Sequence, residues 1–382
     1  MRKLLTYINH WQGRLAIVIL WIFFEALWLV FLGPHFSLES EKYIGQARLL
    51  VTGGHLAEAR FMFYFSTIAV IAFAIKSGIG LYGAMFLIML VNLLCYLYFF
   101  KALRTLFTAS AAPYLVVGFL LSFWPYQSWS VYLYSECLFY SSVLLLLSHL
   151  ILFRGWSSAY LVQLFLIMAF VILSRPLGIL FVIPLVVFLY FHLSRNQKIF
   201  FYVMAVLVIL LFNSVVQTVF TTTSDWNLQK VMQEGDLICN IPNTSGNNNL
   251  KITNNPNQLY QLFYFVTHNF SYFCDLAAKR LLLFFTLRRE YYSGFHNAYL
   301  LLCLGTVYGL ILWRVRQIFS YLPLPVLVFI ILVILSFTLA VALQCDDYHN
   351  RFFLTLMPFW TVLAVAGFFR FPPKRIGGWS GD

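Results

Sequence analysis

Charged side chains are scarce in this chain. Only 10% of its 382 residues are Asp, Glu, Lys or Arg, whereas 62% belong to the apolar and aromatic set. A soluble domain of this length could not bury so much apolar surface, and a membrane span must be a helix or part of a closed barrel. The apolar runs are continuous and rich in Leu, Ile and Phe, without the alternation of barrel strands. We therefore predict an all-α, polytopic transmembrane bundle.

Other absences narrow the class. The six cysteines form no CxxC pair and no cluster with metal-ligand spacing, and the chain has no internal repeats. A disulfide between Cys239 and Cys274 stays open. The net charge of +12 is not gathered in a soluble basic domain, so we predict no nucleic-acid partner and assign the cations to cytoplasmic loops and lipid headgroups.

Ten apolar runs are predicted to span the membrane, with both termini inside. Lys and Arg in the short loops set this sidedness, which places residues 34–60 and 221–296 outside. The run 61–75 would extend only about 22 Å as a helix, less than the ~30 Å hydrocarbon core, so we expect it to lie in the plane of the outer surface. The predicted spans are residues 14–33, 79–100, 108–124, 131–152, 156–173, 176–193, 199–220, 297–313, 321–344 and 351–369.

Three parts follow from this pattern. Residues 1–220 form a transmembrane module whose first outer loop, 34–78, carries an acidic motif. Residues 221–296 form a large outer loop with amphipathic helices. Residues 297–382 form a second transmembrane module and a short cytoplasmic tail. The compact size favours a bacterial inner membrane, with the outer face in the periplasm.

The acidic motif lies in the first outer loop. It contains Glu39 and Glu41, two of only 13 acidic residues in the chain. A carboxylate pair at the membrane surface of such a protein indicates a functional site by default. The alternative is a solvated loop whose acids keep it out of the bilayer.

Further polar residues are predicted on the same outer face, at the ends of spans that are distant in sequence. They are Lys42, Tyr43, His55, Arg60, Tyr134, Glu136, Arg175, Arg280, Arg288, Arg289, His296, Asn297, Asp346, Asp347, His349 and Arg351. A transporter would place such groups near mid-membrane.

Carboxylates and arginines at the interface suit attack by a hydroxyl or amine on a sugar carried by a lipid phosphate. A carboxylate accepts the proton of the nucleophile, and Arg stabilises the leaving phosphate. The partners are then a lipid-linked sugar donor, membrane lipids and a glycan, lipid or protein acceptor. Candidate phosphate contacts are Arg175, Arg351, Arg280 and Arg288, and candidate substrate contacts are Tyr43, Arg60 and His349.

Four stretches, in order, resemble motifs of the GT-C glycosyltransferases, the polytopic family that includes protein O-mannosyltransferases and aminoarabinose transferases. They are Glu39-Ser40-Glu41-Lys42-Tyr43 with Ala47 and Gly53-Gly54, then Tyr134 to Phe139, then Ser174-Arg175-Pro176-Leu177-Gly178, and finally His349-Asn350-Arg351-Phe352 through Pro358. The expected architecture is also similar, with seven spans, an in-plane helix pair after the first, and a large loop after residue 220.

This resemblance implies roles for single residues. Glu39 takes the place of the family's Asp and would be the catalytic base, supported by Glu136. Arg175 and Arg351 would hold the lipid phosphate, and the transfer would invert the anomeric carbon. Because Glu is one bond longer than Asp, the choice between Glu39 and Glu41 as the base stays open. We assign no cofactor from the sequence, and a divalent metal ion on Glu39 and Glu136 stays open.

Two other classes remain open at this point. A lipid or polysaccharide transporter would need charged groups inside the bilayer, for which Glu25 and His149 are the candidates. A non-catalytic scaffold would have carboxylates that diverge in space.

Overall fold

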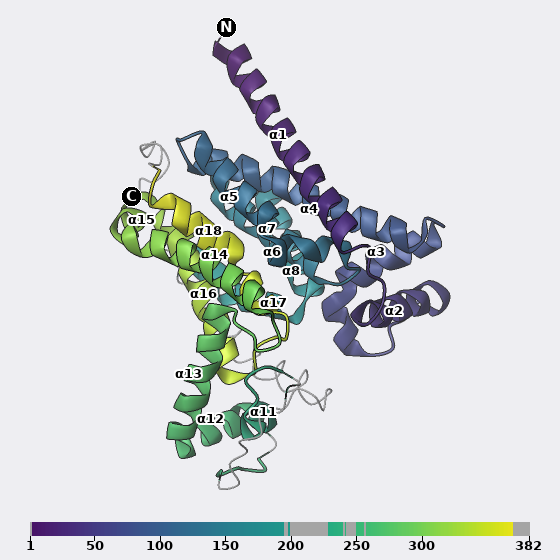
Figure 1. Ribbon diagram of the computed structural model, residues 1–382, viewed down its shortest axis with the longest axis vertical. Helices are drawn as coiled ribbons and strands as arrows, with labels where there is room; N and C mark the ends of the chain where they lie inside the picture. Colours follow the sequence, from purple (N-terminus) through teal and green to yellow (C-terminus); the bar gives the residue numbers. More distant parts are fainter. Residues whose placement is uncertain are drawn as a thin grey trace.

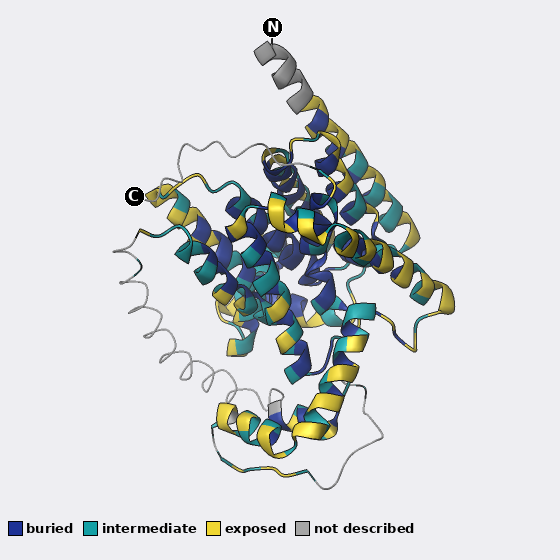
Figure 2. Cartoon of the chain, turned by 90° about the vertical axis from the view of Figure 1, so that its left-hand side faces the viewer, coloured by how far each residue is buried: buried dark blue, intermediate teal, exposed yellow. Residues whose placement is uncertain are grey.

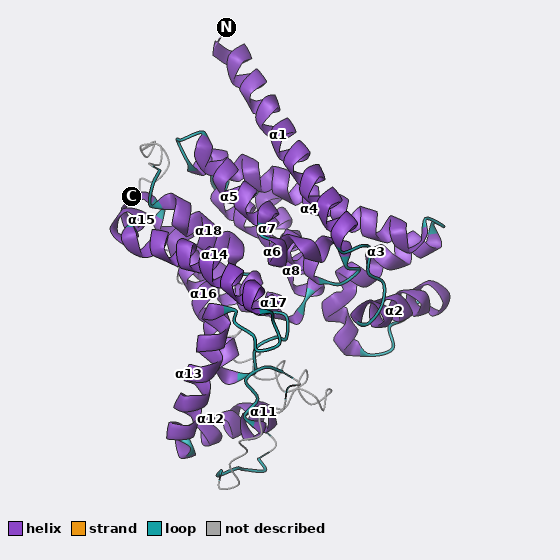
Figure 3. Ribbon diagram, in the orientation of Figure 1, coloured by secondary structure: helices purple, strands orange, loops and turns teal. Residues whose placement is uncertain are grey.

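The computed structural model describes residues 2–194, 198, 228–239, 241, 250–255 and 257–369, and every regular element in these ranges is a helix (Figure 3). The first half contains α1 (Arg2–Phe31), α2 (Glu39–Gly53), η1 (Ala59–Tyr64), α3 (Phe65–Lys76), α4 (Gly80–Leu106), α5 (Ala111–Ser122), α6 (Trp124–Gln127), η2 (Ser128–Val131), α7 (Glu136–Ile151), α8 (Ser158–Ser174), η3 (Pro176–Phe181) and α9 (Val182–Tyr190). The second half contains α11 (Leu228–Glu234), α12 (Gln258–His268), α13 (Phe270–Thr286), α14 (Gly294–Trp313), α15 (Val315–Tyr321), α16 (Leu324–Leu343), α17 (Arg351–Leu354) and α18 (Met357–Ala366).

Glycine and proline set several helix boundaries. Gly78 and Gly80 have φ values of 77° and 69°, in the left-handed region, and form the turn between α3 and α4. Pro176 ends α8 because the residue before a proline is driven to an extended conformation, and Arg175 has a φ of −160°. These breaks leave polar residues at helix ends.

Helix α7 is the centre of the bundle. Its side chains are buried on nearly every side, as expected for a helix that is apolar all round. It packs between α4 and α8, and Figure 2 shows that buried residues, in dark blue, gather in the middle of the bundle. The first residue of α7, Glu136, is therefore held on a rigid and central element.

A buried polar network fastens α1 to this core. Glu25 of α1 accepts hydrogen bonds from the Gln127 amide and from the Ser130 hydroxyl, the latter at 2.6 Å. Gln127 also donates to Asn92 of α4 at 3.0 Å, and Asn92 donates to Ser141 of α7 at 3.0 Å. Since buried polar groups must be hydrogen-bonded, the network fixes η2, which lies beside the acidic motif.

In the part of the chain that the structure describes, five helices are long and apolar enough to cross a membrane. They are Trp11–Phe31, Ala59–Lys76, Gly80–Leu106, Gly294–Trp313 and Leu324–Leu343. Shorter apolar helices lie at Ala111–Ser122, Glu136–Ile151, Ser158–Ser174, Pro176–Tyr190 and Met357–Ala366. The chain is thus all-helical and multi-pass by composition, whereas the number of ten spans stays a prediction.

Two topology predictions need comment. The predicted span 199–220 and the tail after residue 369 lie outside the described residues. The run 61–75 belongs to the 18-residue apolar segment of η1 and α3, which is long enough to be a candidate span. Its placement in the plane of the membrane therefore stays a prediction.

The segment predicted to lie outside, which we call the outer segment, projects away from the bundle in its described residues 228–239, 241, 250–255 and 257–289. Helices α11, α12 and α13 lie together at one end of the molecule, below α14 and α16 in Figure 1. Helix α13 packs along α16 and connects the segment to the bundle.

Candidate functional site

Glu39 is the first residue of α2. The chain reaches it through a tight loop in which His35 pairs with the backbone of Val131 and Leu133, at 2.9 and 3.0 Å. Tyr43 follows Glu39 by four residues and so shares its helix face, and its hydroxyl donates to Glu39 Oε1 at 2.9 Å. Glu41, two residues after Glu39, does not share that face and is exposed.

Glu136 and Arg175 form a second pair. Arg175 lies in the extended link between α8 and η3, and its Nη1 donates to Glu136 Oε1. Gly178 makes this link possible, because a Cβ atom there would overlap the backbone of Val171 and Ile172. The close approach of η3 to α8 thus explains the glycine of the Arg175-Pro176-Leu177-Gly178 stretch.

Arg351 joins the two pairs. Its Nη1 lies 2.5 Å from Glu39 Oε2 and 2.5 Å from Glu136 Oε1. Its Nε donates to Asp347 Oδ1 at 2.7 Å, and its guanidinium carbon lies 5.6 Å from the centre of the Trp129 ring. Residues separated by up to 312 positions therefore meet at one guanidinium. We call Glu39, Glu136, Arg175, Asp347 and Arg351 the charge cluster.

The charge cluster is nearly closed to solvent but open on the side of Glu39. The Glu136 side chain is 0% exposed, whereas the Glu39 side chain is 18% exposed. Lys42 binds Glu39 Oε1 at 3.0 Å from the open side and is half-exposed. With Lys42 included, three carboxylates face three cations.

These contacts control ionisation. Burial would raise the pKa of Glu39, but the charges of Arg351, Arg175 and Lys42 outweigh it and hold the pKa well below its usual value. Burial would likewise raise the pKa of Asp347, but the charges of Arg351 and Arg175 outweigh it, and the pKa is lowered. Glu39 and Asp347 are therefore ionised at neutral pH.

Two buried atoms of the cluster are left without a hydrogen-bond partner within the described residues. They are Glu136 Oε2, an acceptor, and Arg175 Nε, a donor. An unpaired buried polar atom is unfavourable. A ligand hydroxyl can donate to an atom such as Glu136 Oε2 or accept from one such as Arg175 Nε.

The cluster does not fit a divalent metal ion. Arg351 Nη1 occupies the position between the Glu39 and Glu136 oxygens, and Asp347 is bound to the same guanidinium. No group of three or more His, Cys, Asp or Glu side chains in the described ranges could hold a metal. A metal ion there would have to displace Arg351.

Several predicted site residues lie outside the cluster. Arg280 is fully buried, and its guanidinium donates to the carbonyl oxygens of Asp236, Ala342 and Val231 at 2.8–3.3 Å. Its prediction as a phosphate contact is thus corrected, because its donors stabilise the backbone instead. Arg288 is exposed on the loop after α13.

Arg60 and His349 are placed differently from each other. Arg60 pairs with Glu58 at 2.8 Å on the surface of η1. His349 is exposed beside the cluster, where its backbone N–H donates to Asp347 Oδ1 at 3.0 Å and its ring meets the edge of Trp129 at 5.8 Å. Burial and the charge of Arg351 lower the pKa of His349, so its ring is neutral at pH 7.

Sequence reasoning gave no role to Asp347. It precedes Arg351 by four residues, a spacing at which oppositely charged side chains pair on a helix. That spacing was the available signal. In the structure, Asp347 Oδ1 binds Nε of the Arg351 guanidinium.

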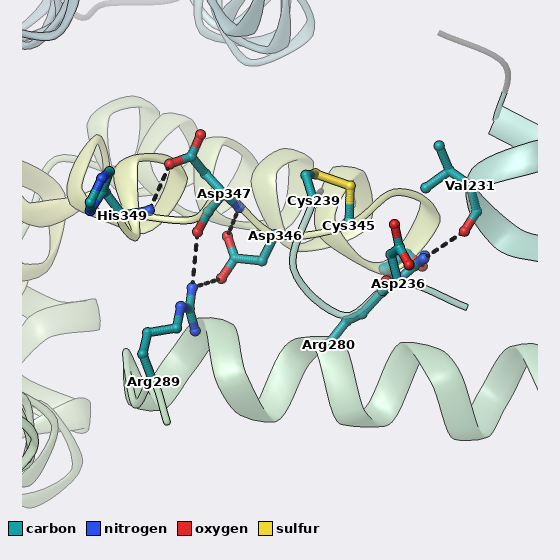
Figure 4. The surroundings of a disulfide bond; sticks show 10 residues. Val231, Asp236, Cys239, Arg280, Arg289, Cys345, Asp346, Asp347 and His349 are labelled. Atoms are coloured by element: carbon teal, nitrogen blue, oxygen red, sulfur yellow. Dashed lines mark hydrogen bonds and ion pairs between the residues drawn. A yellow bond between two sulfur atoms is a disulfide. The ribbon is translucent and has the colours of Figure 1, made fainter. Parts of the chain in front are cut away.

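The open disulfide prediction is wrong in its partner. Cys239 is bonded to Cys345, not to Cys274, which is free and exposed. The bond joins the outer segment to the loop before Arg351 (Figure 4). Sequence could not show this because the two cysteines are 106 residues apart.

Comparison with known proteins adds no relative. No protein-family model, no curated protein and no solved structure matches the chain. The charge cluster is therefore the feature of this chain from which a function can be proposed.

Proposed function

We propose that the chain is a membrane glycosyltransferase of the GT-C type, which transfers a sugar from a polyprenyl-phosphate donor to an acceptor at the outer face of the membrane. The observation that carries this proposal is the meeting of Glu39 and Glu136 at Arg351. Those are the residues that the motif resemblance singles out. Their convergence opposes the scaffold alternative, in which the carboxylates would diverge.

The reaction needs a base and a cation. A hydroxyl of the acceptor attacks the anomeric carbon, the bond from that carbon to the phosphate oxygen breaks, and the hydroxyl proton passes to a carboxylate. Glu39 is our candidate base because it is the most exposed of the three cluster carboxylates, at 18% against 13% for Asp347 and 0% for Glu136. Arg351 and Arg175 stabilise the charge that develops on the leaving phosphate.

Arg351 has opposing effects on the two roles. In the free protein it lowers the pKa of Glu39, which makes that carboxylate a weak base. A donor phosphate competes for the same guanidinium, since Arg binds phosphate as well as carboxylate in a bidentate manner. When Arg351 turns to the phosphate, Glu39 loses a neighbouring cation and its pKa rises. Donor binding thus activates the base.

The disulfide supports the sidedness of the proposal. Disulfides persist in oxidising compartments such as the bacterial periplasm, and Cys239–Cys345 lies two residues from Asp347 of the cluster. The same face was assigned to the outside from the distribution of Lys and Arg. We therefore propose a periplasmic site on a bacterial inner membrane.

The intramembrane groups do not favour the transporter alternative. Glu25 is bound by Gln127 and Ser130. His149 stacks on Tyr160 at 4.2 Å between ring centres and lies 3.3 Å from the Tyr98 hydroxyl. Both are engaged in packing between helices.

The test is transfer of radiolabelled sugar from a panel of polyprenyl-phosphate sugars into membrane extracts. Purified wild type would be compared with Glu39→Gln and Glu41→Gln, with the exposed Glu290→Gln as the control. We expect transfer by wild type and by Glu290→Gln, and loss of about 10²–10⁴-fold in Glu39→Gln, the usual contribution of a general base.

Other outcomes have defined meanings. Loss in Glu41→Gln but not in Glu39→Gln would move the base to Glu41. Transfer by none of the proteins with any donor would refute the proposal, and a lipid-flipping assay would then test the transporter class.

A further inference from the structure

A second buried ion pair lies next to the charge cluster. Arg289 and Asp346 are both fully buried, and Arg289 Nη2 lies 2.6 Å from Asp346 Oδ2 (Figure 4). Neither residue touches the cluster carboxylates Glu39 and Glu136 directly. The proposed reaction has no use for them as catalytic groups, so their burial needs another reason.

The Arg289–Asp346 pair hydrogen-bonds both the N–H and the carbonyl group of the Asp347 backbone. Asp346 Oδ1 accepts a hydrogen bond from the Asp347 N–H at 2.8 Å, and Arg289 Nη2 donates to the Asp347 carbonyl oxygen at 3.2 Å. With its main chain fixed on both sides, Asp347 has little freedom in the direction of its side chain. That side chain holds Arg351 Nε at 2.7 Å.

Covalent and backbone bonds secure Asp346 in turn. Its neighbour Cys345 is bonded to Cys239 of the outer segment. The Cys239 N–H donates to the Asp346 carbonyl at 2.9 Å, and the Asp346 N–H donates to the Leu237 carbonyl at 3.0 Å. The buried Arg280 lies next to this junction and donates hydrogen bonds to three more carbonyl groups, those of Val231, Asp236 and Ala342.

We propose that Asp346 and Arg289 are positioning residues, which set the place of Arg351 between Glu39 and Glu136 by fixing Asp347. The path runs from the outer segment to Asp347, from there to Arg351, and so to the two glutamates. The relevance of this path to catalysis rests on the proposed function, whereas the path itself can be tested without an assay of transfer.

The experiment measures amide hydrogen exchange in the purified full chain, with three peptide regions read in parallel. The first is residues 345–354, at the clamp, the name we give to Asp346 and Arg289 with the Cys239–Cys345 disulfide. The other two are residues 39–47 at the start of α2 and residues 85–103 in the bundle core. The variants are Asp346→Asn and the double variant Cys239→Ser/Cys345→Ser. The matched controls are Asp275→Asn, from the exposed Asp275–Lys279 pair, and Cys274→Ser, from the exposed free cysteine.

We expect both clamp variants to raise exchange in residues 345–354 and, across Arg351, in residues 39–47. The rise should be about tenfold, the factor that corresponds to the loss of one well-made hydrogen bond. Residues 85–103 should be unchanged, and both controls should match wild type. Under the proposed function, Asp346→Asn should also raise the KM for the donor more than it lowers kcat.

A rise confined to residues 345–354, with residues 39–47 as in wild type, would overturn the proposal and leave the pair a purely local role. If Asp346→Asn does not fold, Arg289→Lys replaces it. Lys keeps the charge but is shorter and lacks the planar fork, whose Nη2 contacts Asp346 and the Asp347 carbonyl while Nη1 contacts two further carbonyl groups. The same two peptide regions then decide. If wild type transfers no sugar, the proposed function is refuted, whereas the positioning role shown by hydrogen exchange is unaffected.

Discussion

At the scale of single residues, Arg351 is the centre of the charge cluster. One guanidinium contacts Glu39 and Glu136 through Nη1 and Asp347 through Nε, a geometry that the compact ammonium of Lys does not reproduce. Because the three acids come from α2, α7 and the loop before α17, the residue also links elements that are remote in sequence. Its replacement should affect stability as well as function.

We predict that Arg351→Met destabilises the protein by about 3–5 kcal/mol, because removal of one partner leaves buried carboxylates without compensation. Arg351→Lys should lose less but should not restore wild-type stability. Thermal unfolding of the purified protein would measure both. The exposed Arg288→Met provides the control, and equal stability of Arg351→Met and Arg288→Met would contradict the prediction.

The pKa directions at Glu39 and Asp347 predict the response to acid. Both folded-state pKa values lie below those of the unfolded chain, which are ~4.3 for Glu and ~3.9 for Asp. Their stabilisation is therefore complete above about pH 5 and is lost as the pH falls from the unfolded-state values through the folded-state values. The unfolding temperature should not change on account of these groups between about pH 8 and pH 5, and should fall steeply below about pH 4.

Arg351→Met supplies the check on that interpretation. Without the cation, the two carboxylates lose the cause of their lowered pKa values. The variant should therefore show a smaller additional loss of stability below pH 4 than wild type. An equal loss in both proteins would place the acid sensitivity elsewhere.

Rare charged residues at span ends placed Glu39, Glu136, Arg175 and Arg351 among the candidates, and the motif resemblance singled them out. The sequence could not show that Glu39 contacts Arg351 while Glu41 is exposed, because that depends on which face of α2 packs against the bundle. It also misjudged Arg280. The partners of that residue are backbone carbonyls, which carry no signature in the sequence.

At the scale of elements, the α8–η3 link shows how local geometry sets the site. Gly178 lies against the backbone of Val171 and Ile172, where a Cβ atom has no room. The link also carries Arg175 towards Glu136. A larger residue at position 178 should move both.

We predict that Gly178→Ala destabilises the protein by about 1–3 kcal/mol, the usual effect of overpacking. The control is Gly45→Ala on α2, where the added Cβ meets open space and should stabilise the helix by about 0.5–1 kcal/mol. Thermal unfolding distinguishes the two. Similar changes in both variants would show that the α8–η3 contact is softer than the packing suggests.

Helix types and several breaks could be predicted from apolar runs and prolines, whereas helix directions could not. Residues 61–75 illustrate this limit. Their length argues for an in-plane helix, but α3 continues η1 and the two together reach the length of a candidate span. Hydropathy reports how apolar a helix is and not its tilt.

At the scale of the whole molecule, topology is the property to test. Single cysteines would be placed at the exposed positions Glu41, Ser77 and Ser110 in a Cys274→Ser background and labelled with a membrane-impermeant maleimide. An in-plane 61–75 predicts that positions 41 and 77 react from outside and position 110 only from inside. If residues 59–76 cross the membrane, positions 77 and 110 exchange their behaviour.

The long sequence separation between Arg351 and its partners Glu39 and Glu136 has a consequence for biosynthesis. Glu136 enters the bundle 215 residues before Arg351 is made, which at 5–20 residues per second is a delay of roughly ten to forty seconds. Until then the nascent chain holds a buried carboxylate whose main partners are Arg175 and water. Chains cut short before residue 351 should thus be recognised as incomplete by membrane proteases, so that the last helices act as the signal that assembly has finished.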